Sequence, residues 1–258
     1  MRLLIDAGNT RTKWAWCPAQ PSDDASWEIN ALDNTQWLQG GKAAQRLQQA
    51  VAEAEHISLS LVAGPQWLQP LSALTPRLQC IQPPATALGL HNAYHRPAQL
   101  GSDRWCSLVA VWRQYGQSAL IATAGTALTL DALVVSDAAA KFIGGTIQPG
   151  LRLMWQSLQQ GAAQLDYAYP AAPSPAPGFA LDSQQAMWLG CLQALAASVA
   201  SQFERLQALG DCHPLLVLSG GDAQLLHAYL PQALAVQAII VDNLVLKGLA
   251  YLAEEIDQ

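Results

Sequence analysis

Ile5-Asp6-Ala7-Gly8-Asn9-Thr10 near the start of the chain is echoed by Ala122-Thr123-Ala124-Gly125-Thr126-Ala127 near its middle. Each stretch follows an apolar run and leads into a second, partly apolar one, which is typical of a strand, a tight turn and a return strand. A turn of small residues exposes backbone N–H groups and lets a phosphate group approach where a Cβ atom would block it. Two such hairpins indicate a two-lobed protein that holds the phosphates of a nucleotide.

The repeat extends beyond the hairpins. A strand, a turn and a helix are predicted over 59–74 and again over 215–229, and short strands are predicted to follow at 78–81 and 236–241. This alternation predicts the α/β class with partly parallel sheets. Because Tyr115-Gly116-Gln117-Ser118 interrupts the pattern, we expect an N-terminal lobe over 1–116 and a C-terminal lobe over 117–258, with a nucleotide cleft between them.

Composition narrows the class of protein. The chain has 258 residues, of which 51% are hydrophobic and 12% charged, so it has ample material for a core and is not disordered. Its net charge of −6 argues against binding to nucleic acid or to an anionic membrane. Five scattered cysteines without a C-x-x-C pair indicate reduced thiols. With no apolar run long enough for a membrane helix and no signal peptide, we expect a cytoplasmic protein.

The polar residues of the first hairpin form the first candidate site. The side chains of Asn9, Thr10 and Thr12, together with backbone amides, can donate hydrogen bonds. Lys13 supplies a positive charge, and Asp6 can bind Mg²⁺ directly or through water. The alternative is a polar hairpin in which the lysine forms an ordinary salt bridge. The second copy of the turn favours the functional interpretation.

A second candidate site, Gly101-Ser102-Asp103-Arg104, lies directly before a predicted helix over 105–115. At such a loop–helix junction Asp103 can accept the proton of a hydroxyl group while Arg104 binds an acidic group. The alternative is ordinary N-capping of the helix by Ser102 or Asp103. The two roles do not exclude each other.

Other segments are ambiguous. The glycines of 144–150 and 219–222 can let the backbone approach a ligand, or they can simply make turns. Helices are predicted over 151–160 and 183–209, and the second has an apolar stripe that suits close packing or a subunit interface. The Pro/Ala-rich segment 169–178 is predicted to be a connector or a mobile flap near the site, and the connector is slightly favoured.

Five motifs in a fixed order make the chain resemble the type III pantothenate kinase family, within the acetate/sugar-kinase and actin-like ATPase superfamily. They are DAGNTRTK (6–13), PAQLGSDRW (97–105), AGTALTLD (124–131), GGTIQPG (144–150) and LSGGD (218–222). The resemblance covers essentially the whole chain. It implies two duplicated ribonuclease-H-like lobes, a homodimer, and ATP-dependent phosphorylation of pantothenate to 4'-phosphopantothenate, the first step of coenzyme A synthesis.

The resemblance also implies roles for individual residues. Asp103 would be the general base that takes the proton of pantothenate's primary hydroxyl, and Asp6 would hold Mg²⁺. ATP would be bound by Asp6, Ala7, Gly8, Asn9, Thr10, Arg11, Thr12, Lys13 and Thr126. Pantothenate would be contacted by Tyr94, Gly101, Ser102, Asp103, Arg104 and, from the neighbouring subunit, Ser183.

The chain departs from the family at Thr123. The family's second phosphate motif usually begins with an aspartate that binds a monovalent cation, K⁺ or NH₄⁺, and a neutral hydroxyl is a poor substitute for that carboxylate. We therefore expect weakened or absent potassium dependence.

Thr123 also keeps open a second interpretation, a catalytically weak or inactive family member that acts as a regulatory accessory factor. The presence of Asp6, Lys13, Asp103 and Arg104 favours the enzyme. A kinase for another hydroxy acid or a sugar is a third possibility, and a polymerising actin-like protein is the least favoured.

Overall fold

The computed structural model describes residues 1–18, 27–71, 77–136, 139–162, 164–170, 178–210 and 213–256. The chain forms two compact units, and neither is a continuous stretch of sequence. Unit 1 comprises Met1–Gln117, Leu133–Gly144 and Asn243–Gln258, and unit 2 comprises Ser118–Ala132 and Gly145–Asp242. The C-terminal helix thus belongs with the N-terminal half of the chain. The expected division into lobes at 116/117 stays a prediction.

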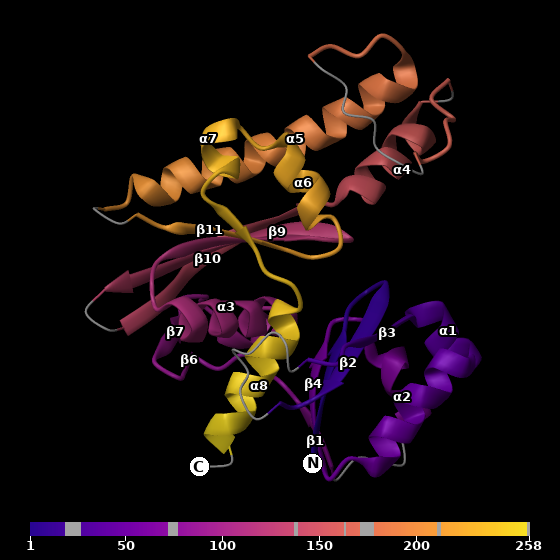
Figure 1. The fold of residues 1–258 in the computed structure, drawn as a ribbon, viewed down its shortest axis with the longest axis vertical. Helices are drawn as coiled ribbons and strands as arrows, with labels where there is room; N and C mark the ends of the chain where they lie inside the picture. The colour runs from indigo at the N-terminus through magenta and orange to yellow at the C-terminus, as the bar shows by residue number, and fades with distance from the viewer. Residues whose placement is uncertain are drawn as a thin grey trace. The chain divides into compact units, whose positions relative to one another are not determined.

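Unit 1 is built on a five-stranded sheet with the order β3-β2-β1-β4-β5 (Figure 1). Its strands are β1 (Arg2–Ala7), β2 (Arg11–Trp16), β3 (Asn30–Asp33), β4 (His56–Leu61) and β5 (Leu78–Cys80). The predicted hairpin is confirmed, since β1 and β2 are antiparallel, whereas β4 runs parallel to β1 and β5 parallel to β4. Leu3, Leu4 and Ile5 of β1 are completely buried, which is typical of a central strand covered on both faces.

Helices cover this sheet: α1 (Asn34–Gln39), α2 (Lys42–Glu53), α3 (Ser102–Tyr115) and α8 (Leu244–Ile256). The helix predicted from Pro65 is a 3₁₀ helix, η2 (Pro65–Leu71), with Pro70 inside it; 72–74 lie outside the described residues. A shorter 3₁₀ helix, η4, spans Pro97–Gln99. The side chains of Trp37 and Trp67 stack at 5.2 Å between ring centroids in the hydrophobic core that the sheet forms with α1, α2 and η2.

Helices α3 and α8 pack so closely that their backbones are in contact. A Cβ atom on Gly248 of α8 would lie 1.9 Å from the carbonyl oxygen of Cys106 on α3. Such a distance is far inside van der Waals contact, so only glycine allows the two backbones to approach this closely. The sequence gives no sign of this contact, because α8 was not among the predicted helices.

The second sheet repeats the order of the first. It runs β12-β11-β8-β9-β10-β7-β6, and its first five strands, read in reverse as β10-β9-β8-β11-β12, match β3-β2-β1-β4-β5. Its strands are β6 (Thr86–Ala87), β7 (Leu90–Asn92), β8 (Ala119–Ala124), β9 (Ala127–Ser136), β10 (Ala139–Pro149), β11 (Leu215–Ser219) and β12 (Ala238–Ile240). Strand β11 is parallel to β8, and β12 to β11, as in the first sheet.

The strand register in the two sheets shows which residues of the two hairpins are equivalent. Asp6 on β1 pairs with Ser60 on β4, and Thr123 on β8 pairs with Ser219 on β11. Asp6 and Thr123 therefore occupy the same place in their respective hairpins. The α/β fold with a repeated hairpin is confirmed.

Unit 2 carries the helices α4 (Leu151–Gly161), α5 (Ser183–Gln207), α6 (Ala223–Tyr229) and α7 (Gln232–Ala235). The predictions for α4 and α5 are confirmed to within two residues. Of the two alternatives for 144–150, turns are wrong, because 144–149 belong to β10 and only Gly150 lies outside it, at the N-cap of α4. Most of the Pro/Ala-rich segment, 171–177, lies outside the described residues, as does Cys212.

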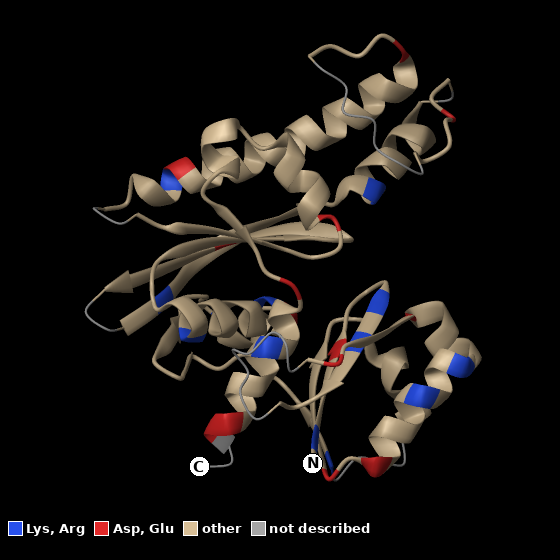
Figure 2. Ribbon diagram, viewed as in Figure 1, with Lys and Arg blue, Asp and Glu red and all other residues tan. Residues whose placement is uncertain are grey.

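Helix α5 is the one helix in the described ranges that is long and apolar enough to cross a membrane, and half of its most apolar window is buried. Its charged residues are confined to its C-terminal end (Figure 2). The core helix of a water-soluble protein meets the same criteria, so this is weak evidence for a span.

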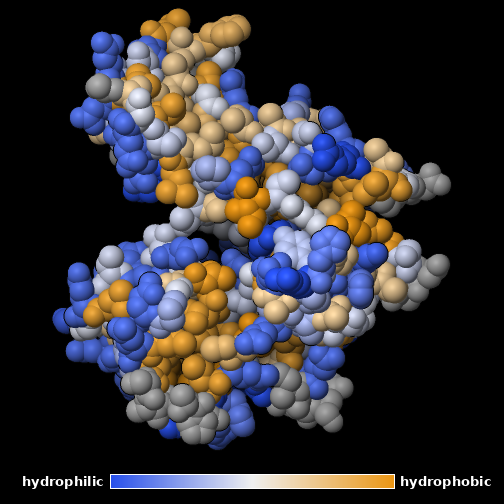
Figure 3. Space-filling model, turned by 180° about the vertical axis from the view of Figure 1, so that it is seen from behind, coloured by the Kyte–Doolittle hydropathy of each residue, from blue (hydrophilic) through white to orange (hydrophobic). Residues whose placement is uncertain are grey.

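On the face seen in Figure 3, hydrophobic side chains appear in several groups on an otherwise mostly hydrophilic surface.

Candidate active site

The turn between β1 and β2 is held from outside by Asn34, the first residue of α1. Its Nδ2 donates hydrogen bonds to the carbonyl oxygens of Gly8 and Asn9, at 2.7 and 3.1 Å. Its backbone N–H donates a third hydrogen bond, to the carbonyl oxygen of Thr10. Its Oδ1 accepts a hydrogen bond from the buried hydroxyl of Thr12, which itself accepts one from Nε1 of Trp67. The hydroxyl of Thr12 thus stabilises the turn from within, contrary to its expected availability for a ligand.

Three charged side chains interact electrostatically in unit 1: Asp6, Lys13 and Asp103. Burial raises the pKa of Asp6 to about 7, repulsion from Asp103 adds to this rise, and Lys13 opposes it. Burial also raises the pKa of Asp103, although hydrogen bonding and the charge of Arg104 oppose that rise. Asp6 and Lys13 face each other across the hairpin, so the strand pairing accounts for their proximity.

Asp6→Asn is expected to stabilise the metal-free protein at pH 8. Because its folded pKa of about 7 lies above the ordinary 3.8, the folded state binds more protons, and this carboxylate lowers stability as pH rises from about 4 to 7. One pKa unit corresponds to about 1.4 kcal/mol. Since Asp6 is only half-buried by exposed area, we expect a gain of about 1–2 kcal/mol, reduced to less than half at pH 5.

Urea unfolding in the presence of a chelator measures this effect at both pH values. Glu53→Gln, an exposed neutralisation on α2, is the control and should change little. Equal stability of Asp6→Asn and wild type at pH 8 would contradict the raised pKa of Asp6 in the folded protein.

The start of α3 is anchored to β4 by hydroxyl groups. The buried Oγ of Ser102 lies 2.9 Å from Oγ of Ser60 and accepts a hydrogen bond from the backbone N–H of Leu61 at 3.1 Å. The alternative of N-capping by Ser102 or Asp103 is wrong, because Gly101 is the N-cap of α3 and no side chain caps this end of the helix. Oδ1 of Asp103 instead accepts a hydrogen bond from the N–H of Arg104 at 2.8 Å.

The guanidinium group of Arg104 lies beside two aromatic rings that contact each other. Its Cζ is 5.8 Å from the ring centroids of both Tyr94 and Phe142, and its Nη1 donates to the hydroxyl of Tyr94 at 2.9 Å. The two rings are 5.2 Å apart. Arg104 and Phe142 are buried, so the arginine is held in one orientation by cation–π contact and hydrogen bonding. Two of the predicted residues, Tyr94 and Arg104, are thereby brought together.

In unit 2, the turn between β8 and β9 is enclosed by two glycine segments. The N–H of Gly150 donates a hydrogen bond to the carbonyl oxygen of Thr126, and the N–H of Asp222 donates one to the carbonyl oxygen of Ala124. A Cβ atom would lie 2.0 Å from the Gly125 oxygen if placed on Gly150, and 2.1 Å from the Ala124 oxygen if placed on Gly220. Gly150 and Gly220 thus serve close approach between backbones, whereas a Cβ atom on Gly144 or Gly221 would meet nothing within 4 Å.

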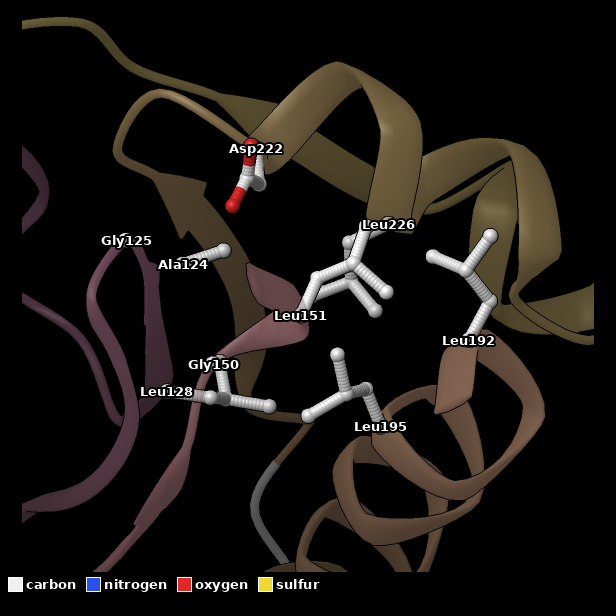
Figure 4. A pocket seen from close by; sticks show the side chains of 9 residues that line it. All are labelled: Ala124, Gly125, Leu128, Gly150, Leu151, Leu192, Leu195, Asp222 and Leu226. Atoms are coloured by element: carbon white, nitrogen blue, oxygen red, sulfur yellow. The ribbon is translucent and has the colours of Figure 1, made fainter. Parts of the chain in front are cut away.

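A small cavity of about 10 Å³, enough for roughly one water molecule, lies beside this turn. Figure 4 shows the carboxylate of Asp222 and the turn at one side, and leucines of α4, α5 and α6 at the other. Burial raises the pKa of Asp222, and Arg152 opposes that rise. Thr123 and Thr126 lie on or beside this turn, and Ser183 is the exposed first residue of α5.

The donor set of the hairpin fits magnesium. In the described ranges there is no cluster of three or more metal-ligating side chains. Mg²⁺ keeps several water ligands and is usually bound by one or two carboxylates together with substrate phosphates. Asp6, a half-buried carboxylate beside a turn in which Asn9 and Thr10 are exposed, meets that requirement.

Sequence reasoning missed the residues that support the site: Asn34, Ser60, Trp67, Phe142 and Asn243. Each lies far along the chain from the residue that it contacts, and none belongs to one of the five motifs. Only the strand pairing could have pointed to Ser60, because it lies opposite Asp6 on the parallel strand β4.

Comparison with known proteins gives a consistent result. The model of the type III pantothenate kinase family matches residues 2–205. The type III pantothenate kinase of Laribacter hongkongensis is 36% identical over 262 residues, which cover 98% of each chain. That of Methylobacillus flagellatus is 35% identical and covers 97% of this chain and 96% of its own.

Solved structures show the fold. A conserved Baf family protein from Campylobacter jejuni, suggested to be a transcriptional activator, has a TM-score of 0.60 at 18% identity and covers 99% of this chain and 98% of its own. The archaeal actin homologue Ta0583, in complex with ADP, has a TM-score of 0.50 at 12% identity and covers 99% of both chains. The fold is that of the sugar kinases and actin-like ATPases, and by its sequence the chain belongs to the type III pantothenate kinase family.

Proposed function

We propose that this protein transfers the γ-phosphoryl group of ATP to the primary hydroxyl of pantothenate, the first step of coenzyme A synthesis. The observation that carries the proposal is the arrangement at the start of α3. There a half-buried carboxylate, Asp103, lies next to the buried guanidinium of Arg104 and within electrostatic reach of Asp6. Family membership supports it, because the relatives reported above are type III pantothenate kinases.

Phosphoryl transfer needs positioning and charge neutralisation more than covalent chemistry by the protein. Mg²⁺ held by Asp6 would neutralise phosphate charge when bound with ATP. The backbone N–H groups of the first turn and the ammonium of Lys13 would orient the phosphates, with the turn held rigid by Asn34. Ala7, Gly8, Asn9, Thr10 and Arg11 are proposed contacts through the same turn, and Thr126 through the turn of unit 2.

Asp103 is proposed as the general base. Its pKa is raised by burial, which makes the carboxylate a better proton acceptor for a hydroxyl group than an exposed aspartate is. Arg104, held by Tyr94 and Phe142, is suited to the carboxylate of pantothenate, because a guanidinium binds carboxylates with two parallel hydrogen bonds. The hydroxyl of Ser102 is committed to β4, so we propose that Gly101 and Ser102 meet pantothenate through their backbone.

Transfer of labelled phosphate from ATP to pantothenate in the presence of Mg²⁺ tests the function. Parallel reactions with other hydroxy acids and with sugars test the substrate class. The proposal requires product with pantothenate well above that with every other acceptor. No transfer to any acceptor would favour the regulatory alternative. None of the relatives reported above supports that alternative, and the likeness to the Campylobacter protein, at 18% identity, shows the fold alone.

Activity is expected to depend little on potassium. Thr123 stands where the first hairpin has the carboxylate of Asp6, and one neutral hydroxyl contributes little to binding of a monovalent cation. We expect turnover in K⁺, NH₄⁺ and a bulky organic cation to agree within about twofold, and Thr123→Asp to introduce activation by K⁺. Strong activation of the wild type by potassium would contradict this expectation.

A homodimer in the cytoplasm is the proposed working form. A cavity of about 350 Å³ between α4 and α5 is lined mainly by apolar residues, among them Met154, Leu158 and Met187. Leu153 and Leu158 of α4 and Ile147 of β10 are exposed, and exposed apolar groups of this kind mark protein interfaces. In a dimer, Ser183 would complete the pantothenate site of the neighbouring subunit, as the family resemblance implies.

A further inference from the structure

Asn243 contacts a residue that the proposed function uses, yet it has no role of its own so far. Its Oδ1 accepts a hydrogen bond from Nζ of Lys13 at 2.9 Å. Lys13 lies on β2, whereas Asn243 directly precedes α8, 230 positions further along the chain. Both residues are half-buried and belong to unit 1, so the contact lies within one compact body.

The backbone at Asn243 is unusual. Its φ of 56° lies in the left-handed region, which in the described ranges is shared by only one other non-glycine residue, Leu88. Asparagine and aspartate tolerate this region better than other side chains, but glycine suits it best. Its carbonyl oxygen accepts a hydrogen bond from the N–H of Lys247, and this is the first hydrogen bond of the α8 helix. Glycine would satisfy this backbone, whereas only a side-chain acceptor can hold Lys13.

Lys13 has a second neighbour, Asp6. It pairs with Asp6 across the hairpin, and paired residues place their side chains on the same face of the sheet. A lysine has a flexible four-carbon stem, so with Asp6 as its single partner the ammonium would be drawn to that carboxylate. The amide oxygen of Asn243 offers a neutral acceptor, which orients the ammonium without cancelling its charge.

We propose that Asn243 is a positioning residue that holds the Lys13 ammonium in the orientation in which it meets the phosphates of a nucleotide. The inference deepens the proposed function and rests on it in one respect, the contact between Lys13 and ATP. It goes further in assigning a specific requirement, a neutral side-chain acceptor in a left-handed backbone, to the residue before the C-terminal helix.

Two substitutions separate the side chain from the backbone. Asn243→Gly keeps the left-handed conformation and removes the acceptor, so we expect an unchanged melting temperature and about tenfold weaker binding of Mg·ATP, with KM for pantothenate unchanged. Asn243→Asp keeps shape and acceptor but pairs its charge with Lys13, so Mg·ATP binding should weaken at least as much. If Asn243 only stabilised the helix start, Asn243→Asp would bind Mg·ATP like wild type, which would overturn the proposal.

A double-mutant cycle with Lys13→Met tests whether the effect passes through the lysine. In the Lys13→Met background, Asn243→Gly should cause no further loss of Mg·ATP affinity, since no ammonium remains to be positioned. A full tenfold loss in that background would overturn the proposal. Leu88→Gly, at the other left-handed non-glycine position, is the backbone control and should leave Mg·ATP affinity unchanged.

The outcome can be told apart from failure of the proposed function. If the wild type binds Mg·ATP but phosphorylates no pantothenate, the proposed function fails, while the affinities above still decide the role of Asn243. If it binds no nucleotide, acylation of Lys13 followed by mass spectrometry decides instead, with the exposed Lys42 as internal reference. Asn243→Gly should then raise the acylation rate of Lys13 several-fold, and an unchanged rate would refute the contact.

Discussion

A fall in kcat by about 10²–10⁴-fold is the expected result of Asp103→Asn, the contribution typical of a general base. The amide cannot accept the hydroxyl proton of pantothenate. Its Oδ1 can still accept the hydrogen bond from the N–H of Arg104 that Asp103 accepts at 2.8 Å, so the start of α3 should keep its conformation. Removal of a neighbouring negative charge also lowers the pKa of Asp6, which favours the ionised form that binds magnesium.

Turnover, affinity for Mg·ATP and melting temperature are measured together. Glu53→Gln is the matched control, because it neutralises an exposed carboxyl group of the same unit. In the wild type, kcat/KM should fall as pH is lowered, since protonated Asp103 cannot act as a base. Survival of most of the turnover in Asp103→Asn would leave the kinase standing but would exclude Asp103 as the base.

Gly248→Ala is expected to have the largest effect on stability. The new Cβ would lie 1.9, 2.5 and 2.7 Å from the O, C and Cα atoms of Cys106. These are backbone atoms of a buried helix, so relief requires α3 and α8 to separate rather than a side chain to rotate. We expect the free energy of unfolding to fall by at least about 3 kcal/mol, the upper end of the usual overpacking cost. A larger loss would make the variant insoluble on expression.

Gly161→Ala is the control for the removal of a helical glycine. Its Cβ would have no neighbour within 4 Å, so its effect on unfolding free energy should stay within about 1 kcal/mol. Urea unfolding of both variants provides the comparison. A soluble Gly248→Ala protein as stable as Gly161→Ala would show that α3 and α8 can move apart at little cost.

Local patterns predicted the elements that carry the repeat. The two hairpins are visible because an apolar run, a small-residue turn and a second run each have a sequence signature. The end of α3 was predictable from Gly116, whose left-handed φ of 63° suits a glycine C-cap. Strand β10 was hidden by its glycines, since Gly144 and Gly145 favour a turn when only neighbours in sequence are considered, whereas pairing with β9 imposes a strand.

The charged residues of the candidate site were predictable in kind but not in arrangement. Asp6, Lys13, Asp103 and Arg104 stand out because charge is scarce in this chain. What each one contacts depends on residues brought in by the fold: Phe142 from β10 reaches Arg104, and Asn243 reaches Lys13. Such contacts join positions tens or hundreds of residues apart, for which no local periodicity exists. The buried hydroxyl of Thr12 shows the same limit, because only the structure reveals that it serves the turn.

The two glycines that close on the second turn restrict how this protein can evolve. Gly150 and Gly220 touch the turn's backbone, so no other residue can replace either one unless the segment that carries it moves as well. Thr123 pairs with Ser219 on β11, a strand position that any residue except proline can occupy, so its side chain beside the same turn can be exchanged. A lineage can therefore exchange the residue at 123, and with it any response to cations, while the turn itself is inherited unchanged.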